Sequence, residues 1–318
     1  MSHRARTMST QIHPYDSGAL AEAAALIGAG EPVAVPTETV YGLAADATSE
    51  TAVARIYEAK GRPSFNPLIV HVSDLDMARR LVAFSPAAEA LASAFWPGAL
   101  TMVLPRLPDC PVATLASAGL PTLAVRLPSH PAMRALIAAA GVPLAAPSAN
   151  RSGTISPTRA SHVLASLGGR IPMILDAGPA SDGVESTIVR PEAHAVFLLR
   201  PGPITPDRIE AATGLPVISP DAAEGITAPG QLTSHYAPSK PVRLDCREPI
   251  EGHFHIGFGP GPCQRNLSAS GDLVEAAANL FAALHEADAS AFAGITIAPI
   301  PEGGIGTAIN DRLRRAAA

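Results

Sequence analysis

One stretch of this sequence concentrates side chains that bind negatively charged ligands. It follows a β-branched run and contains, in order, Thr39, Lys60, Arg62, Asn66 and His71. A guanidinium that grips a carboxylate or phosphate contributes about 1.5–3 kcal/mol per charge-assisted hydrogen bond, and its planar fork fixes the orientation of the anion. Such a site acts by positioning reactants and neutralising charge, as phosphoryl and nucleotidyl transfer require.

Four of these five residues also have a simpler structural interpretation. Thr39 could bond to the backbone at a strand end, and His71 could be a hydrogen-bonded strand residue. Lys60 and Arg62 could cap the C-terminus of a helix. Within residues 33–43 and 60–71, however, Glu38 is the only acidic residue. This excess of donors favours a ligand site over a set of separate structural roles.

A second polar stretch, residues 147–158, follows an apolar run that is expected to form a strand. Ligands of α/β proteins bind in loops beyond strand ends, so its hydroxyl and amide groups predict hydrogen bonds to a ligand. The same composition is also typical of a nest of Asx and Ser turns. Further polar residues at expected strand ends are Thr122, Arg126, Ser186 and Arg200.

Alternating helical and strand patterns position these residues. Helices are expected at 16–30, 49–60, 74–81, 86–96, 130–140 and 205–213. Strands are expected at 32–36, 67–72, 99–104, 122–127, 143–146, 171–175, 186–189 and 195–199. The alternation predicts one α/β domain at 9–214, with a twisted mixed sheet flanked by helices.

The composition changes after this domain. Residues 215–240 are rich in Pro, Ser, Gly and Ala without periodicity, which is typical of an interdomain linker. Residues 241–318 return to alternating elements, with strands expected at 253–258 and 294–298 and helices at 271–285 and 305–315. This predicts a small second α/β domain. Its last helical turn carries Arg312, Arg314 and Arg315, where cations complement the helix dipole.

Composition and motifs narrow the functional classes. The chain has 318 residues, 47% of them apolar, and a net charge of -5, so no global basic field attracts nucleic acid. The sequence contains no phosphate-binding P-loop or Gly-x-Ser-x-Gly elbow, and Cys110, Cys246 and Cys263 lack metal or disulfide spacing. The longest uncharged apolar run has 13 residues, too few to span a bilayer, and no secretory signal is recognisable. We therefore expect a cytoplasmic protein.

The spacing of the polar residues resembles a known family. A Lys-x-Arg at 60–62, followed much later by a Ser-x-Asn at 148–150, is similar to the hallmark of the YrdC-like domain of threonylcarbamoyl-AMP synthases. The resemblance runs from about Ser9 to Gly202, continues through His235-Tyr236-Ala237-Pro238, and ends at 310–315. It implies the two-domain type, in which a YrdC-like domain is linked to a small C-terminal Rossmann-like α/β domain.

The resemblance implies a nucleotidyltransferase. The reaction would join L-threonine, bicarbonate and ATP into threonylcarbamoyl-AMP and diphosphate, for threonylcarbamoyladenosine modification of tRNA. The implied partners are downstream tRNA threonylcarbamoyl-transfer proteins, whereas direct tRNA binding is left open. Mg²⁺ would arrive on the ATP phosphates, with no metal ligands from the protein and no tightly bound cofactor.

The resemblance also implies a role for each site residue. Lys60 and Arg62 would be the catalytic cations. L-threonine would contact Thr39, His71, Arg126, Ser148 and Ser186, with its carboxylate on Arg126. ATP would contact Lys60, Arg62, Asn66, Thr122, Asn150, Thr158, Arg200 and Tyr236. Tyr236 would place the linker at 215–240 across the active site as a strap or lid.

The linker departs from the pattern of the family. It reads Ala-Pro-Gly-Gln at 228–231 where the family usually has Ser-Pro-Gly-Met, and it lacks a basic residue directly before His235. We therefore expect this segment to grip phosphate less firmly than its counterparts do.

Two other functions are compatible with parts of the sequence. One is an RNA-binding module without ATP turnover, against which stand the acidic net charge and the aromatic content of only 4%. The other is a carbamoyl-transfer enzyme, since YrdC-like domains also occur in hydrogenase-maturation carbamoyltransferases. Those proteins carry a Cys-x-x-Cys zinc finger, which the cysteine spacing of this chain excludes.

Overall fold

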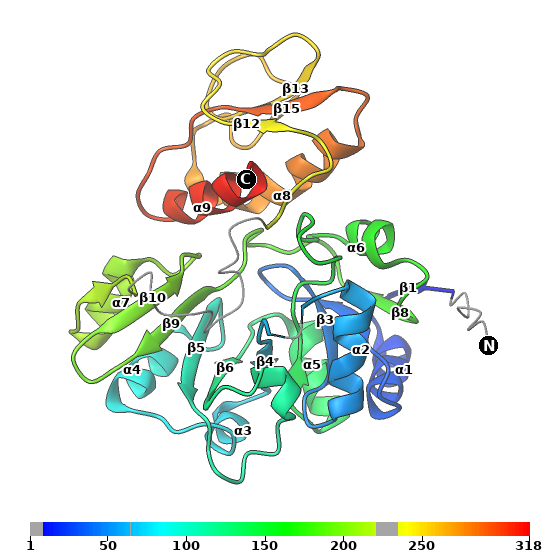
Figure 1. Ribbon diagram of the computed structural model, residues 1–318, viewed down its shortest axis with the longest axis vertical. Coiled ribbons are helices and arrows are strands. Elements are labelled where there is room, and N and C mark those ends of the chain that lie inside the picture. The colour runs from blue at the N-terminus through cyan, green and yellow to red at the C-terminus, as the bar shows by residue number, and fades with distance from the viewer. Residues whose placement is uncertain (1–8, 64, 221–234) are drawn as a thin grey trace.

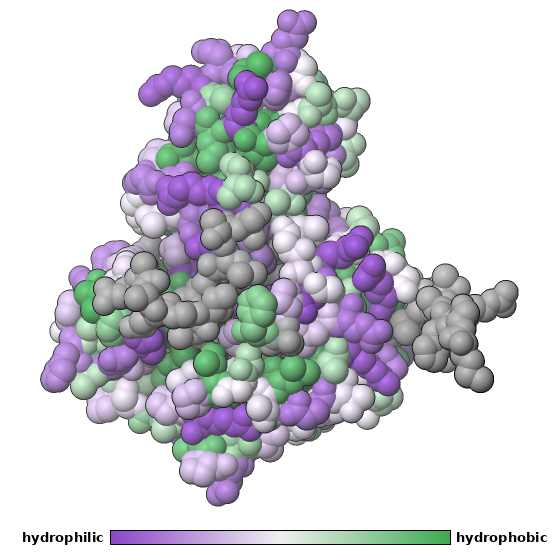
Figure 2. Space-filling view, viewed as in Figure 1, coloured by the Kyte–Doolittle hydropathy of each residue, from purple (hydrophilic) through white to green (hydrophobic). Residues whose placement is uncertain are grey.

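A large lobe carries the N-terminus and a small lobe carries the C-terminus (Figure 1). The computed structural model describes residues 9–63, 65–220 and 235–318. Figure 2 shows the small lobe standing on the broader one, with hydrophilic residues spread over both.

The large lobe is built on an 11-stranded sheet in the order β1-β8-β2-β3-β7-β4-β6-β5-β9-β10-β11. Its strands are β1 Gln11–Pro14, β2 Val33–Pro36, β3 Tyr41–Asp46, β4 Ile69–His71, β5 Leu100–Pro105, β6 Thr122–Arg126, β7 Leu144–Ala145, β8 Met173–Asp176, β9 Thr187–Pro191, β10 Val196–Arg200 and β11 Val217–Ile218. Its helices are α1 Ser17–Gly28, α2 Glu50–Lys60, α3 Leu75–Arg79, α4 Pro86–Phe95, the short η1 Thr114–Ser117, α5 Pro131–Ala140, α6 Ala160–Leu167 and α7 Pro206–Thr213. Because β4 runs parallel to β6 and β5 antiparallel to it, the predicted mixed sheet is confirmed.

The main core lies between this sheet and its helices. It includes Ile27 of α1, Ile56 of α2, Leu91 of α4 and Leu136 of α5, all at most 1% exposed. Burying one such side chain contributes about 1.5–3 kcal/mol relative to leaving it in water. This packing makes the sheet a rigid support for the residues on its other face.

Helix α2 positions Lys60 through its periodicity. Ser49 caps the N-terminus by accepting a hydrogen bond from the Ala52 amide, and the left-handed Gly61, with φ of 60°, ends the helix. Val53 and Lys60 are seven residues apart, so they share the buried face of the helix. The ammonium of Lys60 is therefore directed into the protein.

Strands β4 and β6 set the long axis of the site. Side chains alternate across a strand, so Thr122 and Arg126 of β6 lie on one face of the sheet, about 13 Å apart. The parallel register places His71 of β4 beside Arg126, and Ile69 beside Ala124. The aligned strands thus present polar groups at both ends of a short apolar strip.

The small lobe has a four-stranded parallel sheet in the order β12-β15-β13-β14. Its elements are β12 Val242–Arg243, β13 His253–Gly257, β14 Arg265–Asn266, α8 Leu273–Ala289, β15 Gly294–Ile297 and α9 Gly306–Ala316. Figure 1 shows α8 and α9 between this sheet and the large lobe. A separate apolar core joins the sheet to these helices and includes Ile256, Leu280, Phe281 and Ile309.

Several elements differ from the sequence expectation. Strands β1 and β3 and helix α6 were not expected, and β11 lies within residues that were expected to form an irregular linker. Val217 and Ile218 pair with β10 in parallel, which extends the edge of the large sheet. No helix of the described residues is long and apolar enough to cross a membrane.

Candidate active site

A pocket lies over the sheet face that β4 and β6 present. Its lining includes predicted site residues from both polar stretches and from later strands: Thr39, Arg62, His71, Arg126, Ser148, Ser186, Arg200 and Tyr236. It also includes Thr37, Glu185 and His235. Most of these lining residues lie at the ends of strands or in the adjoining loops, among them His71 at the end of β4 and Arg126 at the end of β6.

Arg62 lines this pocket, whereas Lys60 does not line it but contacts the lining residue Ser148, and both cations are bound by main-chain carbonyls. The Lys60 ammonium donates to the carbonyls of Ser148 and Asn150, each at 2.5 Å. Arg62 donates to the carbonyls of Asn66 at 3.3 Å and Pro67 at 3.0 Å. Burial, and then the nearby charge of Arg62, lower the pKa of Lys60 well below 10.5. Both cations lack an acidic partner among these contacts, so an anion in the pocket would be their natural counter-charge.

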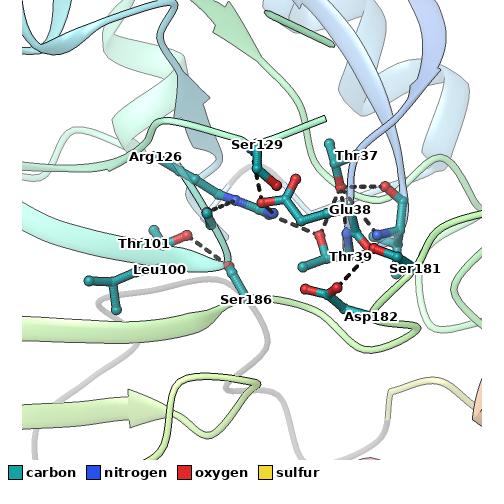
Figure 3. A network of polar contacts seen from close by, with 12 residues as sticks. Thr37, Glu38, Thr39, Leu100, Thr101, Arg126, Ser129, Ser181, Asp182 and Ser186 are labelled. Atoms are coloured by element: carbon teal, nitrogen blue, oxygen red, sulfur yellow. Dashed lines mark hydrogen bonds and ion pairs between the residues drawn. The ribbon is translucent and has the colours of Figure 1, made fainter. Parts of the chain in front are cut away.

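Arg126, another lining residue of the pocket, is held by a network of polar contacts (Figure 3). Its Nη2 lies 2.7 Å from Oε1 of Glu38, its Nη1 donates to Thr39 at 2.9 Å, and its Nε donates to the Gly98 carbonyl at 3.1 Å. Burial raises the pKa of Glu38, but the charge and hydrogen bond of Arg126 outweigh this and lower it to about 2. Because a guanidinium has five N–H groups, these three contacts leave two for a ligand carboxylate.

Ser186 joins this side of the pocket to Arg200. The guanidinium of Arg200 donates to the Ser186 carbonyl at 3.1 and 3.0 Å and to its hydroxyl at 3.2 Å. The Ser186 hydroxyl also lies 2.8 Å from that of Thr101, as Figure 3 shows. Ser186 is fully buried and Arg200 is 5% exposed, so both groups are fixed before a ligand arrives.

Tyr236 lines the pocket on the side that faces helix α8 of the small lobe. Its backbone has φ of 65°, and the following amide, of Ala237, donates to the Gly153 carbonyl at 2.9 Å. The Tyr236 ring packs against Phe281 of α8, with ring centroids 5.5 Å apart. Tyr236 is only 1% exposed, so it is part of the enclosed site.

Other predicted residues lie outside the enclosed pocket. Thr122 is at the far end of β6, and Asn66 is in the loop that Arg62 holds. The Asn150 amide donates to the carbonyls of Arg151 and Thr154 within its own loop. Thr158 contacts His162 of α6 through its amide at 3.3 Å. These four residues and Lys60 are the predicted site residues that do not line the pocket.

Unpartnered polar atoms mark the ligand-binding character of the region. Buried atoms with no hydrogen-bond partner among the described residues include Glu38 Oε2, Asn66 Oδ1, His71 Nδ1, Asn150 Oδ1, His235 Nδ1 and Tyr236 OH. A buried polar group without a partner costs about 1–3 kcal/mol. A polar ligand could supply these partners and offset that cost.

The sequence expectation missed two residues of this region. Glu185 directly precedes Ser186 and lines the pocket, and Arg312 of α9 is bound to Glu185 at 2.8 Å. We expected Arg312 to complement the helix dipole, and its side chain is in fact fully buried and paired with a residue of the large lobe. Its place three residues after Ile309, on the apolar face of α9, is the available sequence signal.

Within residues 9–63, 65–220 and 235–318, no group of three or more His, Cys, Asp and Glu side chains is placed to hold a metal ion. The departure from the family pattern at 228–231 and the position before His235 lie outside the described residues.

Buried histidines make stability depend on pH. Burial lowers the pKa of His71 and of His235 to about 3, whereas an unfolded histidine titrates near 6.5. Below pH 6.5 the unfolded chain binds more protons, so the free energy of unfolding should fall by about 1.4 kcal/mol per pH unit for each histidine. Below 4.5, Glu38, with its pKa of about 2, adds a loss of the same sign.

Urea unfolding at pH 7.0, 6.0 and 5.0 measures this dependence. His71→Gln should reduce the slope of unfolding free energy against pH by about 1.4 kcal/mol per pH unit, which is the contribution of one buried histidine. An equal slope in the variant and the unmodified protein would contradict a neutral, buried His71.

Comparisons with known proteins cover both lobes. A family model described as "Telomere recombination" matches residues 25–202, and one described as "Threonylcarbamoyl-AMP synthase, C-terminal domain" matches residues 204–318. The threonylcarbamoyl-AMP synthase of Bacillus subtilis is 41% identical over 322 residues, which cover 94% of this chain and 92% of the relative. That of Pyrococcus abyssi is 40% identical over 316 residues, which cover 92% of each.

Solved structures agree with these sequence relatives. The crystal structure of Pyrococcus abyssi Sua5 complexed with L-threonine has a TM-score of 0.86 at 37% identity and covers 98% of this chain and 97% of its own. Full-length HypF in the phosphate- and nucleotide-bound form has a TM-score of 0.52 at 22% identity, covering 58% of this chain and 30% of its own. The latter likeness shows the fold alone.

Proposed function

Because this chain belongs to the threonylcarbamoyl-AMP synthase family, we propose that its pocket is where L-threonine, bicarbonate and ATP are joined. The product, threonylcarbamoyl-AMP, serves the threonylcarbamoyladenosine modification of tRNA. The observation that supports this proposal most is the arrangement of charge. Lys60 and Arg62 are bound by main-chain carbonyls and have no acidic partner in these contacts, while Arg126 retains two free N–H groups. A polyanion would balance the first two cations, and an amino acid carboxylate would bind the third.

L-threonine would occupy the end of the pocket at Arg126. Two N–H groups of Arg126 would bind the carboxylate as a fork. Thr39, His71, Ser148 and Ser186 lie around the same space and would bind the amine and hydroxyl. The L-threonine present in the Pyrococcus abyssi structure supports this assignment.

ATP would extend from this end toward Thr122. Lys60, Arg62 and Arg200 supply the positive charge for its phosphates, and Asn66, Thr122, Asn150, Thr158 and Tyr236 would bind its remaining polar groups. The distance of about 13 Å along β6 suits a ligand as long as a nucleotide. The linker at 215–240 would cross above it, between a catalytic domain at 9–214 and a C-terminal domain at 241–318.

The chemistry needs positioning and charge neutralisation, with no covalent bond to the protein. The threonine amine and bicarbonate would form a carbamate and release water. A carbamate oxygen would then attack the α-phosphorus in line, and diphosphate would leave. Lys60 and Arg62 would stabilise the charge that develops on the diphosphate. Arg126 would hold the threonine so that the carbamate faces the phosphate.

A magnesium ion would accompany the nucleotide. The described residues offer no carboxylate cluster for it, whereas ATP phosphates supply the hard oxygen ligands that Mg²⁺ prefers. Bound there, it would neutralise part of the phosphate charge. The downstream tRNA threonylcarbamoyl-transfer proteins would receive the product in the cytoplasm.

Diphosphate release with single substrates omitted tests the function. We expect release from ATP and Mg²⁺ only when both L-threonine and bicarbonate are present, with serine a poorer substitute, because each supplies part of the attacking carbamate. Release that needs neither, or no release under any condition, would contradict the synthase. An RNA titration at two salt concentrations would then test the RNA-binding alternative.

A further inference from the structure

Arg312 of the small lobe reaches the wall of the pocket in the large lobe. Its Nε donates to Oε2 of Glu185 at 2.8 Å, and its Nη2 donates to the Pro201 carbonyl at 3.0 Å. Its guanidinium carbon lies 5.4 Å from the centre of the Tyr236 ring. Arg312 is fully buried, so all of these contacts are shielded from water. One side chain therefore contacts residues that lie next to Ser186 and Arg200, and Tyr236 itself.

Glu185 also binds the polar loop at 147–158, so it links Arg312 to this loop. Its other oxygen, Oε1, accepts a hydrogen bond from the Ser156 hydroxyl at 2.5 Å. Burial raises the pKa of Glu185, but the charges of Arg312 and Arg200 outweigh it, so the pKa is lowered and the carboxylate is charged. The Ser156 carbonyl lies 3.1 Å from Nε2 of His285 in α8. The small lobe thus holds Ser156 through both of its helices.

Backbone packing keeps the Glu185 segment against the small lobe. A side chain at Gly183, whose φ is 72°, would lie 2.3 Å from the Ala277 carbonyl of α8. A side chain at Gly202 would lie 2.3 Å from the Thr187 amide and 2.8 Å from the Glu185 carbonyl. The segment 183–187 is therefore packed between α8 and the loop that follows β10.

We propose that Arg312 is a positioning residue of the synthase, through which the small lobe fixes the Glu185–Ser186 segment and the loop beside Arg200 in the geometry that binds substrate. This inference rests on the proposed function. A buried carboxylate remains charged only while it is paired, and Arg312 supplies that pairing from the other lobe. The small lobe is then needed to complete the site. Arg312 does not itself touch substrate; it holds the segments that carry Ser186 and Arg200.

Kinetics of the full chain test this role. Arg312→Lys keeps the charge but loses the planar fork, and Glu185→Gln/Arg312→Met removes both charges of the pair together, so neither partner is left charged opposite a neutral one. Both variants should raise the KM for threonine at least about tenfold and lower kcat/KM for ATP, because they release Ser186 and Arg200 from the same support. Melting temperatures show that each variant is folded at the assay temperature.

Arg314 offers a matched control on the same helix. It pairs with Glu302 at 3.0 Å, but both side chains are more than half exposed. Arg314→Gln should leave both kinetic parameters within about twofold of the unmodified protein, because exposed pairs contribute little. A folded double variant with an unchanged KM for threonine would overturn the proposal.

A measurement without substrate separates this inference from the function itself. Hydrogen exchange should be faster at amides 185–187 and 235–237 in Arg312→Lys than in Arg314→Gln, whether or not diphosphate is released. If the unmodified protein releases no diphosphate, the proposed synthase function is wrong. The difference in exchange between the two variants still shows whether Arg312 holds the Glu185–Ser186 segment in place. Equal exchange in the two variants would refute the positioning role.

Discussion

Lys60→Met is expected to lower the rate of diphosphate release by roughly 10³-fold, as the loss of a key charge-stabilising donor does in other enzymes. The ammonium has three hydrogens, and the carbonyls of Ser148 and Asn150 take two of them. The third has no acceptor among the described residues and would meet the phosphates. Initial rates with saturating ATP, threonine and bicarbonate measure the loss, which should lie mainly in kcat.

The chain offers a close control, because its only other lysine is Lys240. The Lys240 ammonium also binds two main-chain carbonyls, of Ala287 at 3.0 Å and Ser290 at 2.5 Å. Each substitution thus removes the donor of two carbonyls, at a cost in folding stability of about 1–3 kcal/mol per unsatisfied group. Lys240→Met should keep near-normal turnover. Comparable activity in the two variants would contradict the phosphate role of Lys60.

Arg126→Gln is expected to raise the Kd for threonine by about 100-fold, which corresponds to about 2.7 kcal/mol of lost binding. The substitution removes the fork that would hold the carboxylate. It also leaves Glu38 as an unpaired charge that is 6% exposed, and breaking a buried pair in this way costs about 3–5 kcal/mol of stability. Calorimetric titration with L-threonine and urea unfolding measure the two effects separately.

A double substitution separates the loss of threonine binding from the loss of stability. Glu38→Gln/Arg126→Gln removes both charges, so it should recover much of the stability without recovering threonine binding. Arg79→Gln breaks an exposed pair with Glu89 at 2.9 Å and should change neither. Threonine binding that returns in the double variant would refute the carboxylate role of Arg126.

Local patterns in the sequence were sufficient for much of the fold. The helical period that places Lys60 on the buried face of α2 and the glycine that ends this helix were both readable. Strand β3 was missed because its sequence, Tyr-Gly-Leu-Ala-Ala-Asp, contains residues with little strand preference. Its place in the sheet comes from pairing with β2 and β7, which are set by tertiary contacts.

The site was partly readable for the same reason. Residues within the two polar stretches could be grouped because they are close in the sequence. The Glu185–Arg312 pair could not, since its members are 127 residues apart and each resembles an ordinary surface charge. Such a pair becomes visible only when the two lobes are seen together. The sequence likewise does not reveal that Glu38 forms an ion pair with Arg126 and so takes up one of its N–H groups.

The shared face of Thr122, Ala124 and Arg126 also restricts how this site can change during evolution. Because side chains alternate with a period of two, inserting or deleting one residue within β6 would turn part of this set to the opposite face of the sheet. The same change would shift the pairing of His71 with Arg126. Insertions and deletions should therefore be absent from β6 and should occur in the loops around it. The part of the ligand preference that β6 sets can therefore change only by substitution, whereas the loops that line the pocket can also change in length.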